Sequence, residues 1–279
     1  MRLTDSYPTK DAQTRLIEFA AQQIQNAMQD TSVAVRHNAF TDYCLALLFC
    51  CTGHRPVIDP IHSRKLFDLD HGWMLIADKV VHEERSWRLV SLPPIACQQI
   101  QHYLDYLPRL AAWLDQNPQT LRLRKQVEEL LSGTESIPFF FYLDENTPGK
   151  VLSITPSIMA KRWEQHWCLP INFLRHMTAT ELRRYSGQAY LAQIQLGHFS
   201  GSEHPFGVTA AQSAQKILAD ISTHLEQFMQ DMGWQALTSP VRLPQRATAP
   251  EIEYNGQLKS NPFGDSPRKQ QRQKNRTII

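Results

Sequence analysis

The sequence predicts a mainly helical protein with a small antiparallel β-sheet, an α+β fold. Two observations favour this class: apolar residues recur at helical spacing over most of the chain, whereas residues 65–93 form short apolar runs separated by turn residues. A chain of 279 residues, 42% of them hydrophobic, can bury a sizeable core. We therefore expect one folded domain over 1–238, followed by a tail over 239–279.

The N-terminal part of the domain begins with two predicted helices. Apolar residues spaced by three and four predict an amphipathic helix over about 11–29. A second, more buried helix is predicted over 37–51. We expect it to stop at Gly53, because glycine and the prolines that follow it end helical structure.

Three strands and five later helices complete the predicted domain. The runs 65–70, 73–79 and 87–93 are typical of a small antiparallel sheet, in which Lys79 closes the second strand. A further helix should begin at Thr155 and Pro156, because threonine is a good N-cap and proline suits the first helical position. The other helical segments are predicted over 95–116, 121–131, 178–191 and 210–232.

Cysteine usage and the absence of long apolar runs indicate a cytoplasmic location. The longest apolar run, "LALLFCC", is far shorter than the roughly 20 residues that a membrane-spanning helix needs. The N-terminus has no apolar signal region. The five cysteines include no CxxC pair and three of them lie in one apolar helix, so we expect buried, reduced thiols and no metal site.

The net charge of +2 hides an asymmetry along the chain. Residues 241–279 contain eight basic and three acidic residues, a net charge of +5, and the preceding 21 basic and 24 acidic residues give −3. Residues 239–279 have few large apolar groups, so we expect them to be disordered. The run "RKQQRQKNR" is interpreted either as a solvated tail or as a phosphate-binding arm. Its basic residues are Arg268, Lys269, Arg272, Lys274 and Arg276.

No P-loop, HExxH, GxSxG or dinucleotide-binding glycine pattern occurs, so the sequence lacks the motifs of most common enzyme classes. What remains is a set of basic residues in short boxes. These are Arg55 in "TGHRP", Lys79 at a strand end, Arg175 and His176 in "FLRHMTAT", and His198 in "LGHFS". Each alone is typical of a surface cation or a buried histidine, so only their combination indicates a site.

Together these boxes resemble the catalytic domain of the tyrosine recombinases, the phage-integrase family, over roughly 14–209. "TGHRP" resembles the family's T-G-x-R box, and Lys79 follows Arg55 by 24 residues, where the family's β-hairpin lysine is expected. "NFLRHMTAT" resembles the H-x-L-R-H-x-x-A-T box, and the histidine of "LGH" follows Arg175 by 23 residues. Four boxes in the right order make the resemblance specific.

The resemblance implies a site that holds a DNA phosphodiester and needs no cofactor. Arg55 and Arg175 would clamp the nonbridging oxygens through bidentate donors that lysine cannot imitate. His198 would add a hydrogen bond to the same phosphate. Lys79 would be the general acid that protonates the leaving 5′ oxygen. The family's nucleophile is a tyrosine, which forms a 3′-phosphotyrosyl link.

Two departures from the family pattern concern proton handling and the nucleophile. The first histidine of the H-x-x-R box is replaced by Asn172, which can donate a hydrogen bond but cannot carry a proton. The family's tyrosine follows the L-G-H histidine by about nine residues, a count that reaches Gly207, next to Phe206. Neither residue can attack a phosphate. Phe206 keeps the ring of a tyrosine and lacks its hydroxyl.

Three other tyrosines are alternatives for a displaced nucleophile. Tyr185 and Tyr190 lie between the two boxes, where we expect their rings to pack in the core. Tyr254 lies in the tail, which could deliver it to its own site or to that of a neighbouring subunit. Tyr254 is therefore the preferred alternative.

Three functional hypotheses remain open at this point. The first is a DNA-binding protein of the recombinase fold that lacks its nucleophile and takes part in recombination or integration of a mobile element. The second is an active recombinase that cleaves through Tyr254, and the third is a regulatory module with a vestigial phosphate site. The expected partner is double-stranded DNA, with other recombinase subunits or element-encoded proteins as further candidates, and a bacterial protein of this kind is expected to be nucleoid-associated. Only about 50 residues precede Arg55, so no separate core-binding domain is evident, and the insert over 112–136 is a candidate partner surface or a solvated helix.

Overall fold

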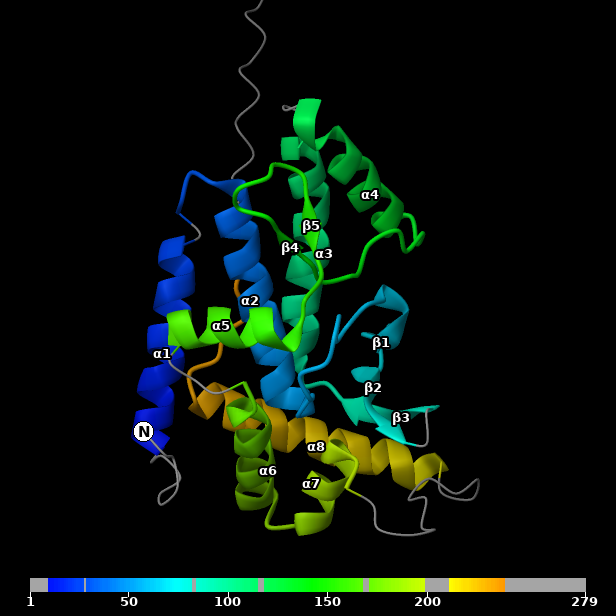
Figure 1. The fold of residues 1–279 in the computed structure, drawn as a ribbon. Coiled ribbons are helices and arrows are strands. Elements are labelled where there is room, and N and C mark those ends of the chain that lie inside the picture. The colour runs from blue at the N-terminus through cyan, green and yellow to red at the C-terminus, as the bar shows by residue number, and fades with distance from the viewer. Residues whose placement is uncertain are drawn as a thin grey trace, which may run out of the picture. The chain divides into compact units, whose positions relative to one another are not determined.

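The computed structural model describes residues 10–27, 29–81, 84–114, 118–167, 171–198 and 211–238. Within them, eight α-helices and two small antiparallel sheets form an α+β fold (Figure 1). The predicted class, mainly helical with a small antiparallel sheet, is confirmed. The chain divides into two units, 1–241 and 242–279, and every described residue belongs to the first. No described helix is long and apolar enough to cross a membrane.

The centre of the fold is helix α2, Val33–Thr52. It begins at Ser32, whose hydroxyl oxygen accepts a hydrogen bond from the Val35 N–H at 3.4 Å. It ends at Gly53, which takes the left-handed conformation with φ 59°, as the sequence predicts for the helix stop. Almost every residue of α2 is buried. The elements around it are helix α1 (Lys10–Ala27), helix α3 (Pro94–Leu114), helix α6 (Phe173–Ser186) and strand β4 (Tyr142–Leu143).

Helices α1, α3 and α5 pack against α2, and helix α4 packs on α3. Helix α1, Lys10–Ala27, contacts α2 and α5, and helix α3, Pro94–Leu114, runs beside α2 (Figure 1). Helix α4, Leu121–Leu131, lies on α3 and buries Leu123, Val127 and Leu130 there. Helix α5 spans Pro156–Trp167, and the Thr155 hydroxyl accepts from the Ile158 N–H at 3.2 Å, so the predicted cap is confirmed. Short 3₁₀ turns occur at Arg64–Leu66 and Pro118–Thr120.

The main sheet has three antiparallel strands in the order β1-β2-β3. Strand β1 is Phe67–Asp68, β2 is Trp73–Val81 and β3 is Glu84–Ser91. Strand β2 continues past Lys79, which pairs with Ser86, so the prediction that Lys79 closes the strand is wrong by two residues. The register shifts between Ile76 and Lys79, so the ladder has a bulge or a similar irregularity there.

A second sheet of two short strands was not predicted. Strand β4, Tyr142–Leu143, pairs antiparallel with strand β5, Val151–Leu152. Each strand has only two residues, so the period-2 pattern that identifies longer strands is absent. The Asn38 side chain of α2 fixes β4, because it accepts from the Leu143 N–H at 2.7 Å and donates to the Leu143 carbonyl at 2.9 Å.

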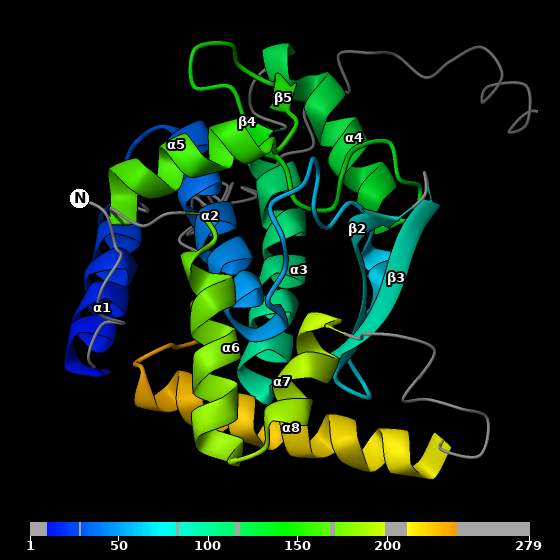
Figure 2. The same cartoon turned by 60° about the horizontal axis from the view of Figure 1, so that its bottom comes forward.

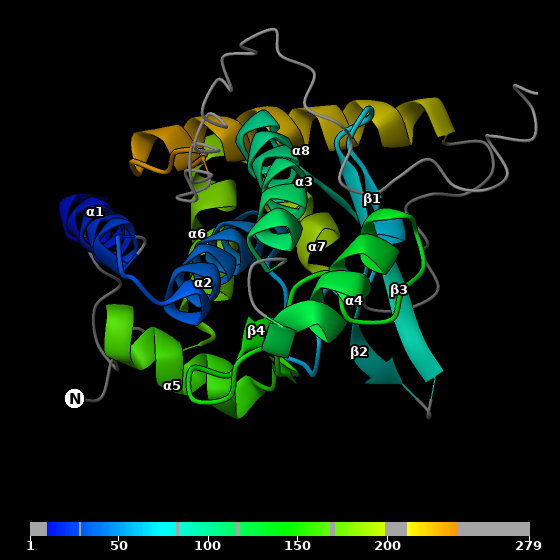
Figure 3. The same ribbon diagram turned by 90° about the horizontal axis from the view of Figure 1, so that it is seen from above.

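The C-terminal part of the domain contains three helices that lie together (Figure 2). The single helix predicted over 178–191 is in fact two: α6, Phe173–Ser186, and α7, Ala189–Leu196. They separate at Gly187, whose φ of 66° ends α6. Helix α8, Ala211–Asp231, runs past α6 and α7 and also contacts α3 and β3 (Figure 3).

The cysteines of α2 are buried in the core as free thiols, as expected. Cys44, Cys50 and Cys51 are at most 1% exposed, and burial raises the pKa of each thiol above its usual value. Cys97 is partly buried and also free, and Cys168 lies outside the described residues. Among the described residues, no three potential metal ligands gather.

Candidate phosphate-binding site

The first predicted arginine follows directly from the end of α2. Gly53 reverses the chain, His54 is buried against Phe49, and Arg55 emerges beyond it. The Arg55 backbone N–H donates to the Asp78 carboxylate at 2.8 Å. Its guanidinium lies 3.6 Å from the same carboxylate and its side chain remains 33% exposed. The end of α2 therefore presents Arg55 to solvent while strand β2 holds its backbone.

The second predicted arginine joins three helices. Arg175, in the first turn of α6, donates to the Gly53 carbonyl at the end of α2 and, at 3.0 Å, to the Leu196 carbonyl at the end of α7. The same guanidinium lies 2.9 Å from Nε2 of His198. Because arginine can only donate, His198 must accept through Nε2 and carry its proton on Nδ1. Arg175 and His198, from boxes 23 residues apart, are thus direct neighbours.

Two residues that the sequence analysis missed hold this arrangement together. Asp78 on β2 is 1% exposed, and Arg88 on β3 approaches its carboxylate at 2.9 Å. Arg88 also donates to the Thr52 carbonyl at 3.3 Å and to the Gln195 carbonyl, so it joins the last turns of α2 and α7 to the sheet. Asp78 is consequently shared by Arg88, Arg55 and, at 3.9 Å, Arg175.

The electrostatics of this arginine cluster (Arg55, Arg88, Arg175 with Asp78 and His198) favour anion binding. Burial alone would raise the pKa of Asp78, but the hydrogen bond and charge of Arg88 outweigh it and lower that pKa to about 2. Burial and the neighbouring arginines lower the pKa of Arg175 to about 10, so it stays charged at neutral pH. Burial and the same arginines also lower the pKa of His198. Three guanidiniums around one carboxylate leave an excess of positive charge.

Two glycines of the predicted boxes allow the close approach of the helix ends. A Cβ on Gly53 would lie 2.2 Å from a methyl carbon of Leu196, and one on Gly197 would lie 2.8 Å from Cδ of Arg88. Both residues also have positive φ, 59° and 65°. The glycines of "TGHR" and "LGH" therefore have a steric role at the contact between α2, α7 and β3.

The other predicted residues fall near the cluster or outside the described part of the chain. Asn172 is exposed at the start of α6 and its side chain makes no capping hydrogen bond. The backbone of Lys79 lies in β2, one residue after Asp78, but its side chain lies outside the described residues. The predicted nucleophile positions, the alternative nucleophile and the basic tail also lie outside them: Phe206, Gly207, Tyr254, Arg268, Lys269, Arg272, Lys274 and Arg276.

The two described tyrosines of this region differ from each other. Tyr185 packs on Phe228 and donates to the Asp231 carboxylate at 2.7 Å, in line with the expected packing role. Tyr190 is 46% exposed in the first turn of α7, so the expectation of a core position is wrong for this ring.

Comparisons with protein-family models, with curated proteins and with solved structures found no match to this chain.

Proposed function

We propose that the chain is a DNA-binding protein with the catalytic fold of the tyrosine recombinases, which takes part in recombination or integration of a mobile element. One observation carries the proposal. Arg55, Arg175 and His198 come from three boxes far apart in the sequence. The two arginines share Asp78, and Arg175 also bonds to the ends of α2 and α7 and lies 2.9 Å from His198. Such a convergence is what the resemblance to the family requires.

The chemistry of the cluster suits a phosphodiester. Arg55 is the most exposed of the three arginines, with 33% of its side chain accessible. Arg175 is fixed by two helix-end carbonyls, and His198 is exposed beside it. Guanidinium groups bind two phosphate oxygens at once, and donors fixed before binding need little reorganisation. The cluster would therefore hold a DNA phosphate between Arg55, Arg175 and His198.

The proposed protein binds this phosphate without cutting it. At the expected position of the nucleophile the sequence has Phe206 and Gly207, which have no hydroxyl group. Asn172 in place of the first histidine of its box also removes a proton carrier. The protein would act as a pseudo-enzyme beside other recombinase subunits.

The DNA-binding part of the proposal is tested by titrating the full chain with a fluorescent duplex at several salt concentrations. Binding should weaken with salt, because phosphate contacts release counterions. A variant with Arg55→Ala and Arg175→Ala should bind at least about tenfold more weakly and lower the salt slope by about 2, one unit for each lost contact. Arg122→Ala, an exposed arginine of α4, is the matched control and should bind like wild type. Absence of salt-dependent binding by wild type would refute the proposal.

The loss of cleavage is tested separately with a nicked suicide duplex that carries the native target site. If the nucleophile is lost, no denaturant-resistant protein–DNA adduct forms. An adduct that disappears in Tyr254→Phe would instead establish the active recombinase with a displaced tyrosine. An adduct that persists in Tyr254→Phe would show that another residue is the nucleophile.

A second candidate function is favoured by Asp78. All three arginines of the cluster lie within 3.9 Å of this buried carboxylate, so an internal acid already neutralises part of the charge that would attract a phosphate. A regulatory module with a vestigial phosphate site would keep such pairing for stability alone. In that case the double arginine variant would lose stability and keep the wild-type affinity for DNA.

A further inference from the structure

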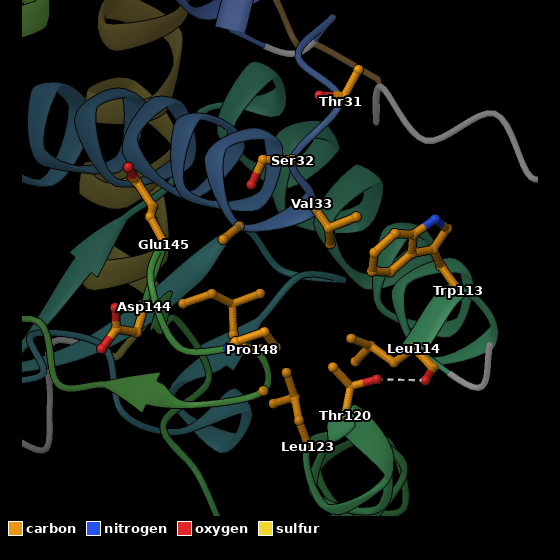
Figure 4. Close-up of a pocket in the computed structure, with 13 residues that line it drawn as sticks. Thr31, Ser32, Val33, Trp113, Leu114, Thr120, Leu123, Asp144, Glu145 and Pro148 are labelled. Carbon is orange, nitrogen blue, oxygen red and sulfur yellow. Dashed lines mark hydrogen bonds between the residues drawn. The ribbon is translucent and has the colours of Figure 1, made fainter. Parts of the chain in front are cut away.

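A cavity of about 240 Å³ lies at the opposite end of α2 from the arginine cluster (Figure 4). Five segments meet there: the start of α2, the end of α3, the Pro118–Thr120 turn, the first turn of α4 and the loop that joins β4 to β5. Since α2 has 20 residues, its two ends lie about 30 Å apart. The cavity is therefore separate from the proposed phosphate site.

The floor of the cavity is apolar. Val33, Leu114, Leu123 and Leu143 are each at most 7% exposed and contribute to its lining. Trp113 is half-buried at its side, and Figure 4 shows its ring facing the same space as Val33 and Leu123. These side chains come from α2, α3, α4 and β4, so the cavity is built by the fold rather than by one loop.

Four polar side chains of the lining, Ser32, Thr120, Asp144 and Glu145, are already engaged within the protein. The Thr120 hydroxyl donates to the Leu114 carbonyl at 2.7 Å, and the Ser32 hydroxyl caps α2. Asp144 pairs with Lys150 at 3.0 Å, and Glu145 pairs with Arg162 at 3.2 Å. Figure 4 shows both carboxylates directed away from the apolar side chains.

We infer that this cavity binds a small, uncharged aromatic molecule of about two fused rings. A ligand with a formal charge would find no unpaired counter-charge among these side chains, because the carboxylates are neutralised by Lys150 and Arg162. The Trp113 ring offers a flat partner for stacking. An apolar cavity of about 150 Å³ accommodates benzene, so 240 Å³ suits a larger ring system. Exposed Thr31 and Pro148 at the rim leave an entrance.

The test uses indole as the probe and the full chain, with binding followed by saturation-transfer NMR and calorimetry. Wild type should bind indole saturably with a dissociation constant below about 1 mM. Benzoate, of similar size but charged, should bind at least tenfold more weakly. The absence of saturable indole binding, or equal binding of both probes, would overturn the inference.

Variants locate the binding in the cavity. Ala34→Phe, which places a ring in the space from the first turn of α2, should weaken indole binding at least tenfold. Ala112→Phe is the matched control, because Ala112 neighbours Trp113 but is exposed on α3 and does not line the cavity, so it should bind like wild type. If Ala34→Phe does not fold, Thr31→Trp at the exposed rim blocks the entrance without entering the core. Unchanged binding by a folded blocking variant would overturn the inference, and neither result bears on the arginine cluster.

Discussion

At the scale of single residues, Asp78 is the residue on which the candidate site depends most. It is 1% exposed and its carboxylate is shared by three arginines. Replacing one partner of a buried ion pair leaves the other charge unpaired, which costs about 3–5 kcal/mol. We predict that Asp78→Asn lowers the free energy of unfolding by this amount, measured by urea denaturation.

The matched control for Asp78→Asn lies on the neighbouring strand. Asp68 pairs with His71 at 2.9 Å, but both side chains are about half exposed or more. Exposed pairs of this kind contribute about 0–1 kcal/mol. The free energy of unfolding of Asp68→Asn should therefore lie within about 1 kcal/mol of the wild-type value. Equal effects of the two substitutions would show that Asp78 is not the structural centre of the cluster.

The buried His37 makes the stability of the fold depend on pH. Its Nε2–H donates to the Phe141 carbonyl at 2.9 Å and its Nδ1 accepts from the Tyr106 hydroxyl at 3.0 Å, so the ring is neutral. Burial lowers its pKa to about 4, below the 6.5 of the unfolded chain, and burial acts in the same way on His54. Between pH 4 and 6.5 the unfolded state therefore binds more protons than the folded state does. As the pH falls from 6.5 to 4, each of the two histidines thus lowers the free energy of unfolding by about 3 kcal/mol.

Urea unfolding at several pH values checks this prediction. Wild type should lose stability steeply between pH 6.5 and 4. His37→Gln should start from a lower stability and show a shallower loss, because one titrating group is gone. His71→Gln, at an exposed histidine, should keep the wild-type slope. A flat profile for wild type over this range would contradict the assignment of buried neutral histidines.

The sequence predicts three residues of the arginine cluster. It also contains a signal for the other two, Asp78 and Arg88, which the prediction missed. The boxes identify Arg55, Arg175 and His198 because each has a recognisable local pattern. Asp78 has none, yet Met74 and Ile76 alternate with it in β2 and are both buried, which places its carboxylate on the inner face. An acid on the buried face of a strand needs a cation, and that requirement was the missed signal for Arg88.

At the scale of elements, the ends of the helices bring the cluster together, and Gly53 is the most restricted of these positions. We predict that Gly53→Ala is more destabilising than Gly187→Ala, although both residues have positive φ, 59° and 66°. The left-handed conformation costs alanine about 1–2 kcal/mol at either position. At Gly53 the new Cβ would also meet Leu196 at 2.2 Å, whereas Gly187 has open space around it, so overpacking should add about 1–3 kcal/mol.

Thermal and urea unfolding of the two glycine variants test this difference. Gly187→Ala is the control, since it shares the backbone conformation and lacks the steric contact. Equal losses of stability in the two variants would mean that Leu196 moves away at no cost. A larger loss at Gly53 would support its role in fixing the contact between α2 and α7.

The elements that were predicted correctly are those with strong local signals. Gly53 ends α2 and Thr155 caps α5 because these residues satisfy helix ends by themselves. The break at Gly187 was missed, since apolar residues continue on both sides of it and a single glycine inside a helical pattern is tolerated. The β4–β5 pair was missed because Asn38 and the surface of α2, rather than any periodicity, determine it.

At the scale of the whole molecule, the charge asymmetry bears on the proposed DNA binding, because the proposal then requires the tail to supply most of the long-range attraction. Residues 1–240 carry a net charge of −3 and residues 241–279 carry +5. A negative body does not attract a polyanion at long range, so the local excess of positive charge at the arginine cluster can act only once DNA is close. The five basic residues of 268–276 would supply the sequence-independent part of binding.

We therefore predict that a full-length variant with glutamine at all five of these positions binds duplex DNA more weakly and with a shallower salt slope. The variant changes Arg268, Lys269, Arg272, Lys274 and Arg276. Each lost phosphate contact should reduce the slope of log affinity against log salt by about 0.9. The control neutralises Arg122, Arg124 and Lys125 of α4 in the same way and should keep the wild-type slope. If the tail variant keeps the wild-type affinity and slope, the tail is only solvated. The arginine cluster would then have to supply the whole interaction, and substitutions at Arg55 and Arg175 would abolish binding rather than weaken it.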